Sequence, residues 1–208
     1  PRSTLFPYTT LFRSNREMLP HSGSYREYVR LTGGGFSAIG TWNADLKENR
    51  AFLSFSRHFH DRGIPVPAIY SVSDDQTCYL QEDLGSVTLF DFLSRIRINE
   101  GFSRTITDEY RKVLAVLPAI QVSAGKEIDY TVCYPRAAFD LQSMLWDLSY
   151  FKYYFLKLAR IPFDEQLLED DFQRFTAYLL SADSDYFMYR DFQSRNIMLK
   201  DGKVWLID

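Results

Sequence analysis

The stretch YFMYRDFQSRNIMLKDGKVWLID, residues 186–208, decides how the rest of the sequence is interpreted. Two runs rich in β-forming residues flank an Asp-Gly pair at 201–202, a pattern typical of a tight β-hairpin. A two-residue turn would place Asn196 opposite Ile207, and one further loop residue would place it opposite Asp208. In either register, the amide and the carboxylate arrive at the same end of one hairpin.

The polar residues at that end have a defined chemistry. Opposed Cβ atoms in an antiparallel pair lie about 5 Å apart, so Asn196 and Asp208 can share a hard cation such as Mg²⁺. Asp191 lies in the loop that enters the hairpin, where a carboxylate can accept the proton of a substrate hydroxyl. Together these groups indicate phosphoryl transfer, which needs alignment and charge neutralisation. The alternative is a surface hairpin with solvated polar ends.

Composition limits the class of protein. The 208 residues, 46% hydrophobic and 16% aromatic, suffice for one larger domain or two small ones with a core. The net charge of −3, without a block of Lys or Arg, argues against nucleic acid as the main partner. Two distant cysteines, Cys78 and Cys133, favour free thiols in a reducing compartment. No apolar run is long enough to span a membrane, so we expect a cytoplasmic protein.

The N-terminal residues are treated separately. TLFPYTTLFRS, residues 4–14, is similar to the conceptual translation of a common short-read sequencing adapter. It lacks the basic start and unbroken apolar core of a signal peptide. We interpret residues 1–14 as an artefact or a disordered segment, and we expect both ends of the chain to be edges of a gene fragment.

The remaining residues predict an α+β fold with a small β-rich N-lobe at 15–85, a hinge near 81–86 and a mainly helical C-lobe at 86–208. Within the N-lobe the sequence predicts a hairpin from 24–31 and 36–42 around TGGG, an amphipathic helix at 45–63, an extended segment at 64–72 and a strand at 77–84. Within the C-lobe it predicts helices near 89–97, 108–124, 139–160 and 164–181, with Thr107 capping the second and Gly125 ending it.

The segment YRDFQSRNIML...VWLID resembles the catalytic segment of the aminoglycoside phosphotransferase and choline kinase group, within the protein-kinase-like fold. The group's pattern is His-x-Asp, four residues, Asn, and a strand pair ending in Ile-Asp. The resemblance implies that Asp191 is the catalytic base and that Asn196 and Asp208 bind the metal. Arg190 falls in the middle of the first triplet, and Tyr189 stands where His is usual.

The N-lobe supplies candidates for binding ATP. Ser22, Gly23 and Ser24 would form a turn whose backbone N–H groups can approach phosphate oxygens. Arg26 and Arg30 share one face of the next strand by two-residue alternation. They could meet the phosphates, or they could be the solvent-facing arginines of an ordinary hairpin.

The group usually pairs a Lys on the third strand with a Glu on the next helix, but FSAIGTW contains no Lys. Glu48 is the candidate for the helix Glu, and its partner would be Arg30, Arg26 or Lys47. The segment LQEDLG at 80–85 would be the hinge strand, and the resemblance implies that its backbone binds adenine. Gln81 and Asp83 are its candidate site residues.

One branch of the group looks nearer: bacterial kinases that phosphorylate the anomeric hydroxyl of cell-wall amino sugars. SYREYVRL, GIPVPAIYSV and YLQEDLG carry this resemblance, which covers about 22–208. The family continues beyond the last Asp, so we expect a C-terminally truncated piece. The expected function is ATP- and Mg²⁺-dependent phosphorylation of a small-molecule hydroxyl, with a sugar or amino sugar favoured. The alternatives are an aminoglycoside acceptor or a non-catalytic nucleotide-binding module.

Overall fold

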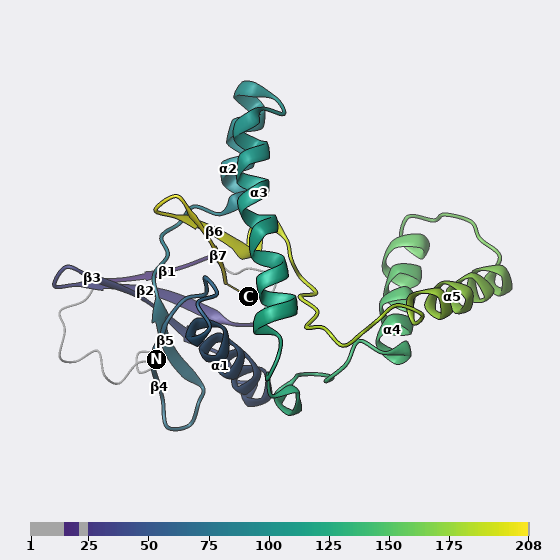
Figure 1. The fold of residues 1–208 in the computed structure, drawn as a ribbon, viewed down its shortest axis with the longest axis horizontal. Coiled ribbons are helices and arrows are strands. Elements are labelled where there is room, and N and C mark those ends of the chain that lie inside the picture. The colour runs from purple at the N-terminus through teal and green to yellow at the C-terminus, as the bar shows by residue number, and fades with distance from the viewer. Residues whose placement is uncertain (1–14, 21–24, 208) are drawn as a thin grey trace. The chain divides into compact units, whose positions relative to one another are not determined.

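The computed structural model describes residues 15–20 and 25–207 (Figure 1). The adapter-like segment, the turn residues Ser22, Gly23 and Ser24, and Asp208 lie outside the described residues. The chain divides into two compact units, residues 135–188 and the remainder. The sheet, the first three helices, the loop at 189–196 and the C-terminal hairpin therefore belong to one unit.

A five-stranded antiparallel sheet forms the N-terminal part of the first unit. Its strands are β1 (Asn15–Met18), β2 (Glu27–Gly33), β3 (Phe36–Trp42), β4 (Ile69–Val72) and β5 (Cys78–Glu82). Their order in the sheet is β1-β2-β3-β5-β4. This β-rich start followed by a mainly helical remainder confirms the expected α+β class.

The β2–β3 hairpin confirms the turn predicted at TGGG. Gly33 pairs with Phe36, so Gly34 and Gly35 are the two central residues of the turn. Both glycines have positive φ, 59° and 84°. A type I′ turn needs positive φ at both central positions, which glycine adopts without steric cost.

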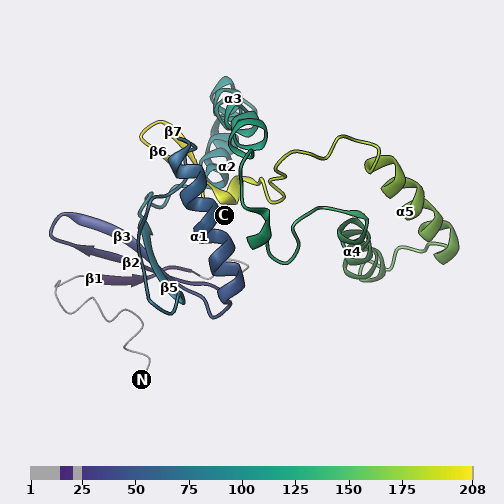
Figure 2. The same cartoon turned by 60° about the horizontal axis from the view of Figure 1, so that its bottom comes forward.

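Helix α1 (Leu46–Asp61) confirms the amphipathic helix predicted at 45–63. The Asp45 side chain caps it by accepting hydrogen bonds from the backbone N–H groups of Lys47 and Glu48. The Phe52 ring stacks on Tyr79 of β5 with 5.3 Å between centroids. Helix α1 therefore covers the sheet face that carries Tyr79, and Figure 2 shows it running along the sheet.

Helices α2 (Leu89–Glu100) and α3 (Arg104–Pro118) follow the sheet. The prediction that Thr107 caps the second helix is wrong, because the N-cap is Ser103. Thr107 lies inside the first turn, where its hydroxyl donates to the Ser103 carbonyl at 3.3 Å. A Thr hydroxyl can accept a bond as an N-cap or donate one to the carbonyl four residues earlier, so residue type alone did not determine where α3 begins.

The helix predicted at 108–124 changes form at Pro118. Residues Ala119–Ala124 continue as a π-helix, and Gly125 follows as the C-cap. Proline has no N–H to donate to the preceding turn, so the regular α-helical bonding is interrupted there.

A two-stranded hairpin of β6 (Ile197–Lys200) and β7 (Lys203–Leu206) completes the first unit. Lys200 pairs with Lys203. Asp201 and Gly202 occupy the two-residue turn with φ of 53° and 73°. The shorter of the two predicted registers is therefore the one formed.

This register fixes the open end of the hairpin, because the Ile207 N–H donates to the Asn196 carbonyl at 3.1 Å. Two backbone bonds hold the hairpin in the unit. Leu199 N–H donates to Val87 at 2.9 Å, and Leu206 N–H donates to Pro65 at 2.8 Å.

The second unit contains α4 (Leu141–Phe151), a π-helical continuation at Lys152–Lys157, and α5 (Glu165–Leu179). Lys152 joins these elements, with its Nζ 2.6 Å from carboxylate oxygens of Glu165 and Glu169. The hydrogen bonds that its ammonium group donates to Glu165 and Glu169 raise the pKa of this lysine above its usual value. Pairing with two carboxylates offsets the cost of burying this cation.

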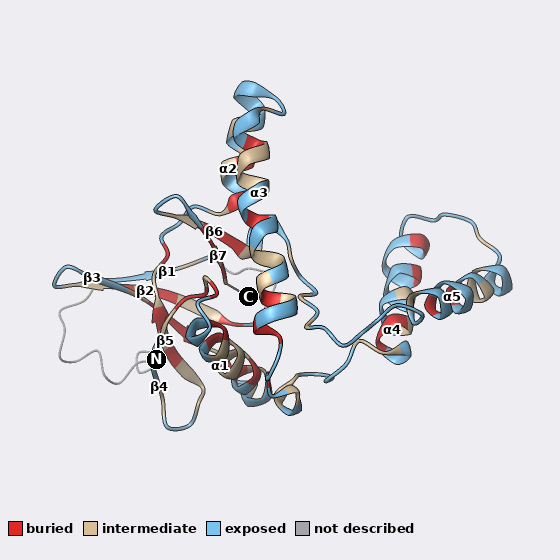
Figure 3. Cartoon of the chain, viewed as in Figure 1, coloured by how far each residue is buried: buried red, intermediate tan, exposed pale blue. Residues whose placement is uncertain are grey.

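Figure 3 shows buried residues of the first unit on β2, β3, β5 and α1, and also on the β6–β7 hairpin and on α2 and α3. They include Val29, Ile39, Leu53, Phe59 and Tyr79. No helix in the described part of the chain is long and apolar enough to cross a membrane. The lobe boundary expected after residue 85 stays a prediction.

Candidate functional site

The loop before β6 brings Asp191 and Asn196 into direct contact. Asn196 Nδ2 donates to Asp191 Oδ2 at 2.8 Å. Gln193 Nε2 lies 2.9 Å from each oxygen of the same carboxylate. Asp191 is exposed, so two side-chain amides orient a carboxylate that remains open to solvent.

The backbone of this loop holds the two residues in place. Gln193 N–H donates to the Asp191 carbonyl, and Asn196 N–H donates to the Gln193 carbonyl, both at 2.9 Å. Residues Ser194–Asn196 form a single 3₁₀ turn that leads directly into β6. The carboxylate is therefore positioned by a short, internally bonded loop attached to the hairpin.

Aromatic contacts connect the loop to its surroundings. Tyr189, at the position where the resembling group has His, packs its ring edge-to-face against Phe192 with 5.3 Å between centroids. The Arg195 guanidinium lies 3.9 Å from the centroid of Phe90 on α2. Arg190 is exposed beside Asp191.

Of the two metal ligands predicted from the sequence, Asn196 and Asp208, the structure describes only Asn196. Asn196 directs its amide nitrogen at Asp191, which leaves its amide oxygen available as an acceptor. Oxygen ligands of this kind suit Mg²⁺, whereas Asp208 lies outside the described residues. Within residues 15–20 and 25–207, no three His, Cys, Asp or Glu side chains gather in a metal-binding cluster.

Glu48 pairs with Arg26, one of the three partners considered from the sequence. Arg26 Nη2 lies 2.9 Å from Glu48 Oε1, and Asn43 Nδ2 donates to Glu48 Oε2 at 2.9 Å. The Arg26 side chain is 5% exposed and lies over the Phe52 ring at 4.9 Å from its centroid. The buried Arg26 side chain, just before β2, is thus connected to helix α1 by an ion pair.

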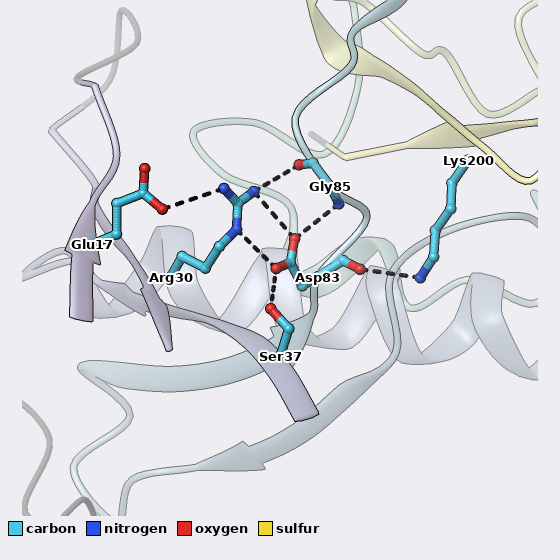
Figure 4. Close-up of polar contacts among 6 residues, drawn as sticks. All are labelled: Glu17, Arg30, Ser37, Asp83, Gly85 and Lys200. Atoms are coloured by element: carbon cyan, nitrogen blue, oxygen red, sulfur yellow. Dashed lines mark hydrogen bonds and ion pairs between the residues drawn. The ribbon is translucent and has the colours of Figure 1, made fainter. Parts of the chain in front are cut away.

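Arg30 has a different partner, Asp83 at the end of β5 (Figure 4). Its Nε donates to Asp83 Oδ2 at 2.8 Å, and its Nη2 donates to the Gly85 carbonyl at 2.8 Å. The Ser37 hydroxyl and the Gly85 N–H also donate to the Asp83 carboxylate. Burial opposes ionisation of Asp83, but these hydrogen bonds outweigh it and lower the pKa of the carboxyl group.

Lys200 of β6 holds the same segment from the hairpin side (Figure 4). Its Nζ donates to Glu82 Oε1 at 2.9 Å and to the Asp83 carbonyl at 3.0 Å. The hydrogen bond with Glu82 raises the pKa of Lys200. We call residues 82–85 the hinge segment, which is therefore fixed both by the sheet and by the hairpin.

Gln81 precedes the hinge segment and is 7% exposed. Sequence reasoning placed Gln81 and Asp83 at the site but missed Ser37, Gln193 and Lys200. Gln193 lies within the quoted motif, two residues after Asp191, where an amide can reach back to the carboxylate. Lys200 bonds to residues more than 100 positions earlier, a separation for which a single sequence gives no signal.

The fold is similar to that of several small-molecule kinases of known structure. A thermostable mutant of aminoglycoside phosphotransferase APH(4)-Ia, solved with ADP and hygromycin B, superposes with a TM-score of 0.56 at 14% identity, over 93% of this chain and 65% of that one. Ethanolamine kinase from Plasmodium vivax gives 0.59 at 13% identity, over 98% and 59%. A choline/ethanolamine kinase family protein from Mesorhizobium loti gives 0.56 at 11%, over 98% and 60%.

These similarities confirm the aminoglycoside phosphotransferase and protein-kinase-like fold expected from the sequence. The chain spans 59–65% of the length of these three structures. No protein-family model and no curated protein sequence matches it.

Proposed function

We propose that this chain belongs to an ATP-dependent phosphotransferase that acts on a hydroxyl group of a small molecule. The observation that carries the proposal is the 2.8 Å contact between Asp191 and Asn196 at the open end of the β6–β7 hairpin. It places an oriented, exposed carboxylate next to an amide with a free oxygen. A proton acceptor beside a ligand for a cation is what phosphoryl transfer to an alcohol requires.

In this proposal Asp191 accepts the proton of the acceptor hydroxyl and directs its oxygen at the phosphorus atom. Asn196 and Gln193 position the carboxylate, because both donate hydrogen bonds to it. Arg190 supplies an adjacent exposed positive charge for the phosphoryl group. Asn196 and Asp208 would hold Mg²⁺, which neutralises charge on the phosphate oxygens when it is bound.

The hairpin sets the distance between the two ends of the nucleotide. Lys200 bonds to the hinge segment, and Asn196 lies at the other end of β6. Four residues of extended strand separate them by about 13 Å. An extended nucleotide can bridge this distance, with its base near the hinge segment and its terminal phosphate near Asp191.

The phosphate-binding residues come from the N-terminal part. The buried ion pair of Arg26 and Glu48 supplies a cation where β3 contains no lysine. Arginine is permanently charged and forms bidentate contacts with phosphate. The backbone N–H groups of Ser22, Gly23 and Ser24 are proposed to contact the phosphates as well.

A sugar or amino sugar is the proposed acceptor, on the strength of the sequence resemblance. Two of the similar structures are an aminoglycoside phosphotransferase and an ethanolamine kinase, so both chemistries belong in the test. We propose a cytoplasmic location and no nucleic-acid partner. The second candidate function is a non-catalytic nucleotide-binding module, favoured by Tyr189 and by the absence of Lys from β3.

The test is Mg²⁺-dependent release of ADP from ATP with N-acetylated amino sugars, aminoglycosides and ethanolamine offered in parallel. Release that depends on one acceptor supports the kinase and identifies its substrate class. Binding of ADP without release in the presence of any acceptor would favour the non-catalytic module. Absence of nucleotide binding would contradict both candidates.

A further inference from the structure

A cavity of about 580 Å³ lies between helix α1 and the turn that connects β4 to β5. We call it the α1 cavity. Its volume suits a small organic ligand, and a few polar groups that face such a space determine what binds there. The polar residues that line it are Arg50, Ser54, Arg57, Ser73, Asp74 and Gln76.

Helix α1 contributes two arginines and one hydroxyl to this cavity. Arg50, Ser54 and Arg57 follow each other at spacings of four and three residues, so they share one face of the helix. The two arginines are two turns apart, about 10 Å along the helix axis. Neither Ser54 nor Arg57 has a polar partner among the residues that the structure describes. Their donor groups are therefore available to an anion.

The β4–β5 turn orients Arg50. The Arg50 Nε donates to Gln76 Oε1 at 3.0 Å, and no described residue bonds to its two Nη groups. Gln76 has a positive φ of 58°. Its N–H donates to the Ser73 carbonyl at 2.9 Å, and Asn49 Nδ2 donates to its carbonyl at 2.8 Å. A non-glycine residue is kept in this unfavourable conformation only where its surroundings enforce it, and such positions cluster at binding sites.

The charges around the α1 cavity favour an anion that also carries a hydrogen-bond donor. Arg50 and Arg57 outnumber Asp74, which is exposed and is the acidic residue of the lining. Asp74 has no polar partner in the described part of the chain. Its carboxylate can therefore accept a hydrogen bond from a ligand hydroxyl while the arginines hold the negative charge.

The α1 cavity lies on the side of the helix away from the ion pair of Arg26 and Glu48. Arg26 contacts Glu48 and the ring of Phe52. Each residue of an α-helix is turned by about 100° from the one before, so Phe52 is about 40° and Arg57 about 180° from Glu48 around the axis. A ligand in the cavity would thus bind apart from the proposed phosphate-binding arginine.

We propose that the α1 cavity binds a small phosphate monoester that also carries hydroxyl groups. Arginine forms bidentate, charge-assisted hydrogen bonds with phosphate oxygens. The long side chains of Arg50 and Arg57 hold the phosphate group near the Ser54 hydroxyl, and Asp74 accepts a hydrogen bond from a hydroxyl of the ligand. The inference does not rest on the proposed function, because none of these residues belongs to the proposed nucleotide or acceptor site.

Glycerol 3-phosphate is a suitable test ligand, because inorganic phosphate and glycerol each supply one half of it. Arg50→Gln and Arg57→Gln should each weaken its binding by about tenfold or more, the effect of one lost charge-assisted contact. Asp74→Ala should bind inorganic phosphate at least as tightly as the wild type does. It should lose the preference for glycerol 3-phosphate over inorganic phosphate, because the acceptor for the hydroxyl is gone.

Arg95→Gln is the matched control. Arg95 is an exposed arginine on helix α2, outside the lining of the cavity. Its replacement makes the same change in net charge, so it should leave the affinity for glycerol 3-phosphate unchanged. Melting temperatures without ligand verify that each variant is folded.

The experiment measures dissociation constants by calorimetry for glycerol 3-phosphate, inorganic phosphate, glycerol and ADP, with the wild-type chain and the four variants. The expected result is wild-type binding of glycerol 3-phosphate that is tighter than that of phosphate, is weakened in Arg50→Gln and Arg57→Gln, and is kept in Arg95→Gln. Absence of binding, equal affinity for glycerol 3-phosphate and phosphate, or equal losses in all three arginine variants overturns the inference. ADP affinity should be the same in every variant, and its absence in the wild type contradicts the proposed function alone.

Discussion

The side chains of Arg26 and Glu48 form an ion pair, with 2.9 Å between Nη2 and Oε1, that connects the residue before β2 to helix α1. Phe52 of the same helix covers the guanidinium. A buried arginine is costly unless it is paired, so removing either partner affects both the packing of α1 and the cation available for phosphate.

Arg26→Ala should weaken ADP binding by at least about tenfold, since a charge-assisted contact to phosphate contributes roughly 1.5–3 kcal/mol. Arg26→Lys should recover part of the affinity, because the charge remains but the planar fork is lost. Lys47→Ala is the control, as Lys47 is an exposed neighbour of Glu48 in the sequence. If calorimetry shows equal losses of ADP affinity in Arg26→Ala and Lys47→Ala, the effect comes from net charge alone and not from a contact between Arg26 and the phosphates.

The low pKa of Asp83 makes the hinge segment sensitive to acid. Its pKa is lower in the folded protein than in the unfolded chain, so the carboxylate stabilises the fold above the unfolded value of about 3.9. That contribution is lost as the pH falls from near the unfolded value toward the folded one.

Asp83→Asn should lower stability at neutral pH and flatten the decline in melting temperature as the pH falls below about 4, the pKa of an aspartate in the unfolded chain. Asp74→Asn, a change at an exposed residue of the β4–β5 turn, controls for net charge. Parallel acid profiles for Asp83→Asn and the wild type would contradict this role.

Lys200→Met should release the hinge segment from the hairpin. Its ammonium group bonds to Glu82 and to the Asp83 carbonyl, and the methionine keeps the apolar stem. We expect faster amide hydrogen exchange at 82–85 and a higher KM for ATP, with a smaller change in kcat. Lys203→Met is the control, because Lys203 is the exposed partner of Lys200 across the turn.

Lys152→Met should loosen the second unit. Lys152 contacts Glu165 and Glu169 on α5. Its loss leaves Glu169 without this cation, whereas Glu165 keeps Lys157 at 3.1 Å. Faster amide exchange in α4 and α5 is the expected result, with ADP affinity unchanged because the proposed nucleotide-binding residues belong to the first unit. Exchange equal to that of the wild type would mean that apolar packing alone holds the two helices together.

Local sequence signals predicted much of this fold. The glycine turn of the β2–β3 hairpin, the Asp-Gly turn of the last hairpin and the amphipathic helix at 45–63 all follow from residue type and its periodicity. The register of β6 and β7 brought Asn196 to the open end of the hairpin as predicted. Helix ends were less predictable. Ser103 and Thr107 are both suitable N-caps, and Pro118 changes the α-helix to a π-helix instead of ending the helical segment.

The candidate site was less accessible from sequence. The sequence predicted Asp191 and Asn196 as site residues, and the structure brings their side chains into contact. Three basic residues were candidate partners of Glu48, and only the packing of α1 on the sheet selects Arg26. The partners of Arg30 and Lys200 are distant in sequence, so long-range packing decides them.

The measurement that tests the central claim most directly compares Asp191→Asn with the wild type, for ADP affinity and for acceptor-dependent release of ADP with Mg²⁺. Asp201→Asn makes the same chemical change in the hairpin turn, where Asn tolerates the positive φ of 53°. We predict that Asp191→Asn binds ADP normally but loses about 100-fold or more of the transfer rate, the size typical of a lost general base. Undiminished transfer in Asp191→Asn, or an equal loss in Asp201→Asn, would contradict the role of Asp191 as the base.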